Sequence, residues 1–181
     1  MAEVIHFTAD QHFGHGNIIR YCNRPFRSVD EMNAVLIERW NSVVKPDDIV
    51  YQLGDFVWGD DLRGPLAYLN GDVRILSYPW HHDARWLRNH FGDATLQPPV
   101  VVLERPELST SKWPQVIVLC HYPFAVWDRK HYGAWHLHGH SHGQYHGEGL
   151  IYDVGVDANN FTPVSLDRIR EIMGDKAEIA S

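Results

Sequence analysis

The chain has little cysteine and no long apolar run. Only two of its 181 residues are cysteines, Cys22 and Cys120, and they lie far apart in the sequence. A disulfide-stabilised scaffold is therefore not expected, and both cysteines are interpreted as small buried apolar residues. No stretch approaches the ~18 apolar residues that a membrane span needs, and the first ten residues lack the basic and apolar regions of a secretion signal. These absences predict a cytoplasmic protein with no membrane partner.

The chain also lacks an excess of positive charge. It has 16 Lys+Arg against 23 Asp+Glu, a formal net charge of −7. Because broad electrostatic binding of nucleic acid needs a basic face, nucleic acid is expected only as a substrate at a small local site. Apolar residues (44%) and charged residues (22%) occur in globular proportions. The length predicts one domain over residues 1–173, followed by a loose tail over residues 174–181. No oligomeric state follows from these features.

Short apolar runs alternate with helical patterns in the first half of the chain, which predicts an α/β fold. Residues 28–31 form a capping box. The apolar residues that follow have the spacing of an amphipathic helix that ends before Pro46. The terminal helix is expected to stop at Gly174. This terminal helix is expected over residues 165–173, and the other helix candidates are residues 60–69 and 83–90. The strand candidates are residues 4–9, 48–53, 72–77, 100–103, 115–119, 135–138 and 150–156.

What the chain has in abundance is histidine, at 13 residues. Histidine is the commonest metal ligand. Five of the apolar runs end in aspartate or histidine, and α/β sheets bind ligands at the carboxyl ends of their strands. The side chains concerned are Asp10, His12, Asp55, His81, His82, Asp83, His121, His140 and His142. Each motif alone also fits a turn residue or a hydrogen-bonded core histidine. Five such ends in one chain indicate that they converge on one site, in which a carboxylate such as Asp55 can bridge two cations.

Polar residues near the first strand end have two interpretations. His15, Asn17 and Arg20 could line a phosphate pocket, since arginine suits bidentate contact with phosphate. They equally fit the start of a helix, with Asn17 as its cap and Arg20 solvated. Arg24 and Arg27 extend the basic patch, which fits either phosphate binding or a solvated face.

Several other polar residues are given structural interpretations. A location behind the metal ligands or at the surface is expected for His136 and His138, because they lie in a strand candidate. Turn formation is expected for Asp157, Asn159 and Asn160.

In this order along the chain, the motifs resemble the calcineurin-like metallophosphoesterase superfamily, in particular its small single-domain bacterial and phage members. The motifs are Asp10-x-His12, Gly54-Asp55, His82-Asp83, His121 and Gly139-His140-x-His142. The resemblance extends through the flanking segments to about residue 166. It implies a four-layer α/β/β/α sandwich of two mixed sheets flanked by helices. It also implies two divalent transition-metal ions, with manganese expected first and iron, zinc or nickel as alternatives.

The resemblance implies a role for each of these residues. The expected ligands of the first cation are Asp10, His12, Asp55 and His142. Those of the second are Asp55, His121, His140 and one ligand from the segment before His82. The implied activity is hydrolysis of a phosphate ester or nucleotide, with diesters favoured, by a hydroxide that bridges the cations. His82 would protonate the leaving oxygen, and Asp83 would orient His82 or act at long range.

The sequence departs from this family at the third motif. Where the family has Gly-Asn-His followed by Asp or Glu, this chain has Trp80-His81-His82-Asp83. His81 then occupies the position of an asparagine whose oxygen binds the second cation. If His81 points away, the second site loses a ligand. We expect it to bind the cation, which favours Zn, Fe, Ni or Mn over Mg or Ca.

Two other functions are compatible with these residues. The altered third motif also fits a catalytically weak or inactive metal-binding interaction module of the same fold, which measured turnover would exclude. A mononuclear hydrolase of amides or lactams would also use many histidines. The His-x-His-x-Asp-His run of such enzymes does not occur in this sequence.

Overall fold

The computed structural model describes residues 4–58, 65–79, 81, 84–90, 95–109 and 112–180, and the structural statements below concern these residues. The strands are β1 (Ile5–Thr8), β2 (Ile49–Gln52), β3 (Asp72–Leu76), β4 (Leu96–Gln97), β5 (Val100–Arg105), β6 (Gln115–Cys120), β7 (Trp135–His138), β8 (Ile151–Asp153) and β9 (Val164–Ser165). The α-helices are α1 (Gly16–Tyr21), α2 (Val29–Val43), α3 (Pro65–Tyr68), α4 (Ala84–His90) and α5 (Leu166–Ala180). The short 3₁₀ helices are η1 (Pro106–Leu108), η2 (Lys130–Tyr132) and η3 (Val156–Ala158).

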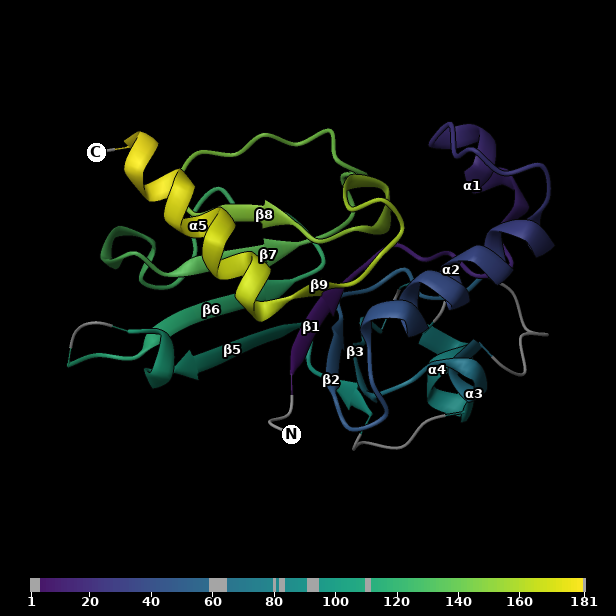
Figure 1. Ribbon diagram of the computed structural model, residues 1–181, viewed down its shortest axis with the longest axis horizontal. Helices are drawn as coiled ribbons and strands as arrows, with labels where there is room; N and C mark the ends of the chain where they lie inside the picture. The colour runs from purple at the N-terminus through teal and green to yellow at the C-terminus, as the bar shows by residue number, and fades with distance from the viewer. Residues whose placement is uncertain are drawn as a thin grey trace.

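Two mixed β-sheets form the centre of the molecule (Figure 1). The first has the strand order β4-β3-β2-β1-β9, and the second has the order β5-β6-β7-β8. In the first sheet, β1 is parallel to β2 and antiparallel to β9. In the second, β6 is parallel to β7 and antiparallel to β5. The prediction of an α/β sandwich of two mixed sheets flanked by helices is therefore confirmed.

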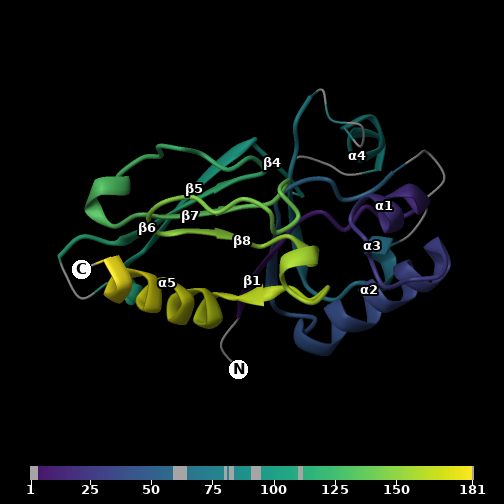
Figure 2. The ribbon, with the colours of Figure 1, turned by 90° about the horizontal axis from the view of Figure 1, so that it is seen from above.

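Alternation along the strands divides the core into layers. On β2, Val50 packs with α2, whereas the next residue, Tyr51, packs between the sheets. The cluster between the sheets also includes Phe7 of β1 and Leu119 of β6, both 0% exposed. Figure 2 shows α1 to α4 grouped at one end of the molecule and α5 at the other.

The helix α2 begins where the capping box predicts. Ser28 is its N-cap, and its side chain accepts a hydrogen bond from the backbone N–H of Glu31 at 3.1 Å. The helix ends at Val43, shortly before Pro46. Its buried residues are Met32, Leu36 and Trp40. Val43, in the last turn of the helix, is 38% exposed.

The helix α5 does not stop at Gly174, so this prediction is wrong. The helix continues to Ala180, and residues 174–180, expected as a loose tail, are helical. Gly174 does not adopt the left-handed backbone that ends a helix at glycine. Good helix formers such as Lys176 and Ala177 follow it, and their propensities offset the cost of about 1 kcal/mol for one glycine. Of the candidate over residues 60–69, the described part contains only α3, at Pro65–Tyr68.

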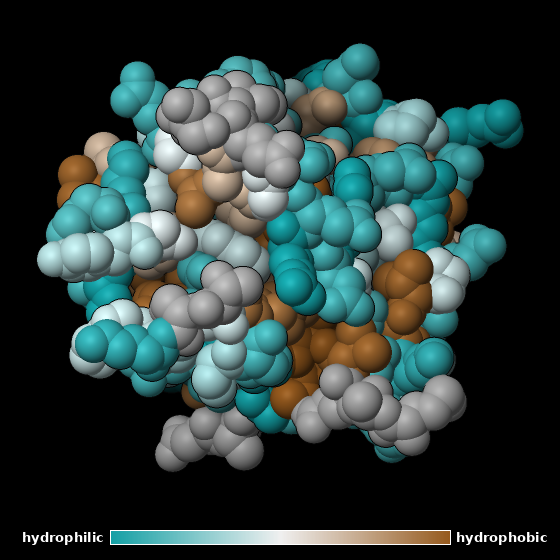
Figure 3. All heavy atoms as spheres, turned by 60° about the vertical axis from the view of Figure 1, so that its left-hand side comes forward, coloured by the Kyte–Doolittle hydropathy of each residue, from teal (hydrophilic) through white to brown (hydrophobic). Residues whose placement is uncertain are grey.

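Figure 3 shows the side of the molecule that lies to the left in Figure 1, where an apolar area interrupts a mostly hydrophilic surface. The outer strand β5 exposes two valines, Val100 at 41% and Val102 at 49%.

Among the described residues, none of the helices has the length and apolar character that crossing a bilayer requires.

Candidate metal centre

The carboxyl ends of strands from both sheets meet at one place. Ala9 follows β1 of the first sheet and pairs with Gly155, which follows β8 of the second. The N–H of Gly139 donates to the carbonyl of His121, which joins the ends of β6 and β7. Because parallel strands end at the same edge, their loops bring distant residues together here. The predicted convergence of these strand ends is therefore present in the structure.

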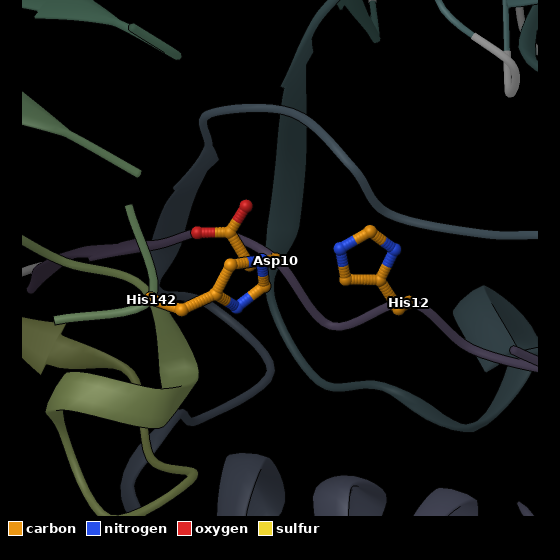
Figure 4. A group of neighbouring side chains, drawn as sticks. All are labelled: Asp10, His12 and His142. Atoms are coloured by element: carbon orange, nitrogen blue, oxygen red, sulfur yellow. The ribbon is translucent and has the colours of Figure 1, made fainter. Parts of the chain in front are cut away.

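One group of possible ligands comes from the loops after β1 and β7. One ligand atom each of Asp10, His12 and His142 lies within 4.8 Å of the others. Figure 4 shows the three side chains around a common space, with Asp10 and His12 on one segment and His142 on the opposing loop. Asp10 and His12 are buried, with exposed fractions of 0% and 5%. These residues are three of the four predicted ligands of the first cation.

A second group consists of Asp55, His81 and His121, whose ligand atoms also lie within 4.8 Å of one another. Asp55 follows β2, and His121 follows β6 directly. His121 is fully buried, and Gly54 makes room for it, since a Cβ at Gly54 would lie 2.7 Å from its Nδ1 atom. His81, expected as the unusual ligand, is therefore close to the other two side chains.

Asp55 lies between the two groups. Its Oδ2 atom is 3.5 Å from Nε2 of His12 and 3.5 Å from Nε2 of His121, and its Oδ1 atom is 3.5 Å from Nδ1 of His81. These separations exceed the usual 2.7–3.2 Å of a hydrogen bond. Ligand atoms that share one cation at ~2.1 Å lie about 3.0 to 3.4 Å apart. The spacing is therefore close to that of side chains that share cations, with Asp55 able to contact two.

Asp10 has a carboxylate that burial makes unfavourable. Desolvation raises the pKa of Asp10 to about 7, although the nearby His121 and His142 lower it in part. Its oxygens accept hydrogen bonds from the backbone N–H of His140 at 2.9 and 3.1 Å. A Cβ at Gly139 or Gly155 would lie 2.6 Å from its Oδ2 atom, so glycine is required at both positions. A cation bound here would stabilise the charged carboxylate.

The imidazole of His12 is in the form that binds metals. Burial, the largest effect, lowers the pKa of His12 to about 3, so the ring is neutral at pH 7. A neutral imidazole has a nitrogen lone pair for a cation.

His142 is held by a pair of residues that the sequence analysis did not assign to the site. Its Nδ1 atom lies 2.6 Å from Oδ2 of Asp157, and Asp157 accepts two hydrogen bonds of 2.8 Å from Arg24. Burial lowers the pKa of His142, but the hydrogen bond to Asp157 and the charge of Asp10 raise it above its ordinary value. This arrangement leaves Nε2 of His142 for a cation, as in the carboxylate–histidine–metal units of known sites.

Arg24 corrects a second interpretation, because it is neither solvated nor available to phosphate. Its side chain is 0% exposed, and it donates to the carbonyl oxygens of Asp10 and Gln11 at 2.7 and 3.0 Å. It therefore fixes the backbone of the first ligand loop. Nothing local in the sequence distinguishes Arg24 from its neighbours Arg20 and Arg27, and Asp157 lies within the short helix η3, as a turn residue would.

His140 lies beside the second group without being one of its three members. Its ring centroid is 5.1 Å from that of His121 and 4.7 Å from that of Tyr122. Burial is the main cause that lowers the pKa of His140. The backbone of His140 contributes to the first group through its hydrogen bonds to Asp10.

Of the three predicted substrate residues, the structure brings one to the site. His15 is 9% exposed, and its ring is edge-on to His12 at 5.3 Å and stacked on Trp58 at 4.0 Å. Asn17 and Arg20 lie on the exposed side of α1. The alternative that Asn17 caps this helix is wrong, because the N-cap is His15.

The remaining predicted residues have varied outcomes. His82 and Asp83 lie outside the described residues. His136 and His138 are buried, so the alternative of a surface location is wrong for both. Cys120 is buried as expected, and Cys22 is partly buried. Although Cys22 lies near His142 and Asp157, burial raises the pKa of its thiol to about 11, which disfavours the thiolate form that binds metals.

The backbone of the ligand loops is strained. Nine described residues other than glycine have a positive φ angle, and five of them are predicted metal ligands: Asp10 (63°), His12 (53°), Asp55 (54°), His140 (65°) and His142 (47°). Such conformations cost free energy and gather at functional sites.

The fold and the site define an α/β sandwich protein with a candidate centre of aspartate and histidine where its two sheets meet. No family model matches the chain. It is 33% identical over 180 residues to the "Uncharacterized protein MJ1445" of Methanocaldococcus jannaschii, a match that covers 93% of this chain and 90% of the relative. The chain therefore belongs to the same family as that protein.

A solved structure supports the fold. It is titled "The Crystal Structure of the Protein of Unknown Function AQ665 from Aquifex aeolicus", and it superposes with a TM-score of 0.71 over 94% of this chain and 100% of its own. At 22% sequence identity, this likeness concerns the fold alone.

Proposed function

We propose that the protein is a phosphoesterase, with diesters as its preferred substrates, that uses two divalent transition-metal ions. The observation that supports this proposal is the position of Asp55. Its two oxygens lie 3.5 Å from ring nitrogens of His12, His81 and His121, so one carboxylate connects the two ligand groups. A carboxylate between two cation sites is what a two-metal hydrolase needs.

The donors of the two groups fit transition metals. They consist of two carboxylates and four imidazoles, namely Asp10, Asp55, His12, His81, His121 and His142. Imidazole suits Fe, Ni and Zn, and carboxylate oxygens suit Mn, whereas Mg and Ca prefer sites made of oxygen alone. Manganese is our first expectation, with iron, zinc or nickel as alternatives.

Two divalent ions held by these residues would neutralise the charge of a phosphate ester and lower the pKa of a water molecule. The side chains of the protein fix the geometry for this chemistry. Asp157 holds His142 by its Nδ1 atom, and Arg24 holds Asp157 together with the carbonyl of Asp10. His82 is proposed, on sequence resemblance alone, to give a proton to the leaving oxygen, with Asp83 orienting it. Phosphate esters or nucleotides are the proposed substrates.

The test is hydrolysis of chromogenic esters by metal-depleted protein to which Mn²⁺, Co²⁺, Zn²⁺, Ni²⁺ or Mg²⁺ is returned. We expect turnover of bis(p-nitrophenyl) phosphate with a transition metal and none after chelation. In the variant Asp55→Asn, the rate of diester hydrolysis should fall by more than about 100-fold. Removal of a residue that only supports a metal ligand costs about that much at most. Asp128→Asn, at an exposed position on the segment between β6 and β7, is the matched control and should keep full activity.

A metal-loaded wild-type protein that hydrolyses neither this diester nor p-nitrophenyl phosphate would contradict the proposal. If such a protein still bound two ions, the alternative of a metal-binding interaction module would take its place. Replacement of His82 by alanine should lower kcat for poor leaving groups and leave the metal content unchanged. An unchanged kcat would remove the role of His82 alone.

A further inference from the structure

The imidazole of His81 is held on three sides. Its Nδ1 atom faces Oδ1 of Asp55 at 3.5 Å, and its Nε2 atom lies 2.7 Å from the hydroxyl oxygen of Tyr122. One ring face is stacked on Tyr78, with centroids 4.4 Å apart and planes at 17°. The side chain of His81 is only 8% exposed. This ring is therefore placed by specific partners.

Tyr78 connects His81 to the other imidazole of this group. Its hydroxyl oxygen accepts a hydrogen bond from the backbone N–H of His121 at 2.7 Å and donates to the carbonyl of Pro99 at 2.6 Å. The side chain is 5% exposed. One buried tyrosine therefore sets the position of His121 through its hydroxyl group and that of His81 through its ring.

Tyr122 engages one ring nitrogen of His81, Nε2, and leaves Nδ1 facing Asp55. When the ring proton is on Nε2, this nitrogen donates to the oxygen of Tyr122, and the lone pair of Nδ1 points towards Asp55. The opposite tautomer would direct an N–H at the place where a cation binds. A hydrogen bond to the second nitrogen of a histidine ligand fixes its tautomer and orientation and increases its basicity.

We propose that Tyr78 and Tyr122 are positioning residues that hold His81 as a nitrogen ligand, and that this ligand makes the second cation site select transition metals over Mg²⁺. The inference rests on the proposed metal centre and adds its selectivity. With His81 and His121 in place, at least two of the donors are imidazole nitrogens beside one carboxylate. Mg²⁺ binds oxygen ligands and gives up its water reluctantly, so a nitrogen-rich site disfavours it.

The experiment measures metal binding rather than turnover. Metal-free wild-type protein is titrated with Co²⁺, followed by calorimetry and by the visible spectrum of the bound ion, with and without competing Mg²⁺. We expect two Co²⁺ ions per chain. In Tyr122→Phe, the first ion should bind as in the wild type, and the Kd of the second should rise about 10–100-fold, the usual cost of removing such a partner. The spectrum of the second ion should also change.

Two further variants complete the test. His81→Asn offers an amide oxygen in place of the ring nitrogen, so the preference of the second site for Co²⁺ over Mg²⁺ should fall by about tenfold or more. Tyr132→Phe removes a hydroxyl group from a residue that is 80% exposed on η2, and it should bind both ions as the wild type does. Tyr78→Phe should weaken the second site as well. If Tyr78→Phe does not fold, the result for Tyr122→Phe alone tests the inference.

The inference would be overturned if Tyr122→Phe bound the second ion with the affinity and the spectrum of the wild type. This holds even if the variant melted at a lower temperature. A wild-type chain that bound only one Co²⁺ would overturn it too. Failure of the proposed function is separate: a chain that bound two ions as described but hydrolysed no phosphate ester would lose the proposed activity and keep this selectivity.

Discussion

The pair formed by Asp157 and Arg24 shows how single side chains support the site. The guanidinium of Arg24 is fully buried, and its charge is balanced by Asp157. The same carboxylate orients His142. A buried charge that loses its partner is costly, whereas an exposed one is not.

Asp157→Asn should therefore act on stability and on metal binding together. We expect the free energy of unfolding of the metal-free protein to fall by about 3 to 5 kcal/mol, because Arg24 loses its anionic partner. Affinity for the first cation should fall about 10–100-fold. Chemical denaturation and metal titration measure the two effects, with Asp128→Asn as the control. Unchanged stability would show that the backbone carbonyls alone satisfy Arg24.

His136 makes stability depend on pH. Its Nδ1 atom lies 3.0 Å from the carbonyl of Val118, and its Nε2 atom accepts from the N–H of Phe124, so the ring is neutral. Burial lowers the pKa of His136 to about 4 from 6.5. Between these values the unfolded chain binds a proton that the folded chain does not. The contribution of neutral His136 to the free energy of unfolding is therefore complete above pH 6.5 and is lost as the pH falls. The loss is on the order of 3 kcal/mol by pH 4.

The variant His136→Gln removes this titration. The wild type should exceed the variant in free energy of unfolding by a larger margin at pH 7 than at pH 4.5, in chelator-treated samples. His131→Gln, at an exposed position, should give the same small difference at both pH values. A margin that does not change with pH would exclude His136 as the source.

At the residue scale, the sequence predicted those candidate ligands that follow a strand in the chain. Asp10, His12, Asp55 and His121 have this signal, and the structure brings them together. Asp157 has no such signal, because it acts on His142 through a contact between two loops. The proposed role of Tyr78 could not be predicted from the sequence either. It depends on the stacking of its ring and on a hydrogen bond from a backbone N–H 43 residues away.

At the scale of elements, two glycines show that the effect of this residue on stability depends on its backbone conformation. Gly174 lies within α5, and Gly133 ends η2 with φ +84°. A Cβ at either position would meet no atom within 4 Å. The two positions therefore differ in backbone conformation and not in space.

Gly174→Ala should raise the free energy of unfolding by about 0.5–1 kcal/mol, because alanine favours the helix and restricts the unfolded chain. Gly133→Ala should lower it by about 1 kcal/mol, because its left-handed backbone is unfavourable for a residue with a Cβ. Thermal and urea denaturation measure both. Stabilisation by both variants would contradict the conformational explanation.

Elements with a strong pattern were predictable, and the shortest ones were not. The capping box at Ser28 and the spacing of the apolar residues located α2 to within a few residues. The two-residue strands β4 and β9 are too short to show a period, and they exist because neighbouring strands offer unpaired backbone groups. The end of α5 was missed because glycine allows a helix stop without requiring one.

At the scale of the whole molecule, the candidate centre joins the two sheets. Asp10 and Asp55 follow strands of the first sheet, whereas His121 and His142 follow strands of the second. Cation binding is therefore expected to stabilise the fold, because it links parts that separate on unfolding. Strand order was beyond the sequence patterns: β9, from the end of the chain, lies beside β1, from its start.

Addition of Mn²⁺ at about 100 times its Kd should raise the free energy of unfolding by about 2.7 kcal/mol for each site. Differential scanning calorimetry with and without the ion measures the shift. Asp55→Asn should lose most of it, since both sites share this carboxylate, and Asp128→Asn should keep it. An equal shift in Asp55→Asn would place the stabilising ion elsewhere.

The left-handed backbone of the ligand loops has a consequence for laboratory evolution. Each of Asp10, His12, Asp55, His140 and His142 occupies a conformation that glycine adopts with less strain. A library selected only for heat tolerance, with a chelator present, will accumulate glycine or asparagine at these five positions. Such a library should yield more stable proteins that no longer have the candidate metal ligands, unless metal binding is screened in every round.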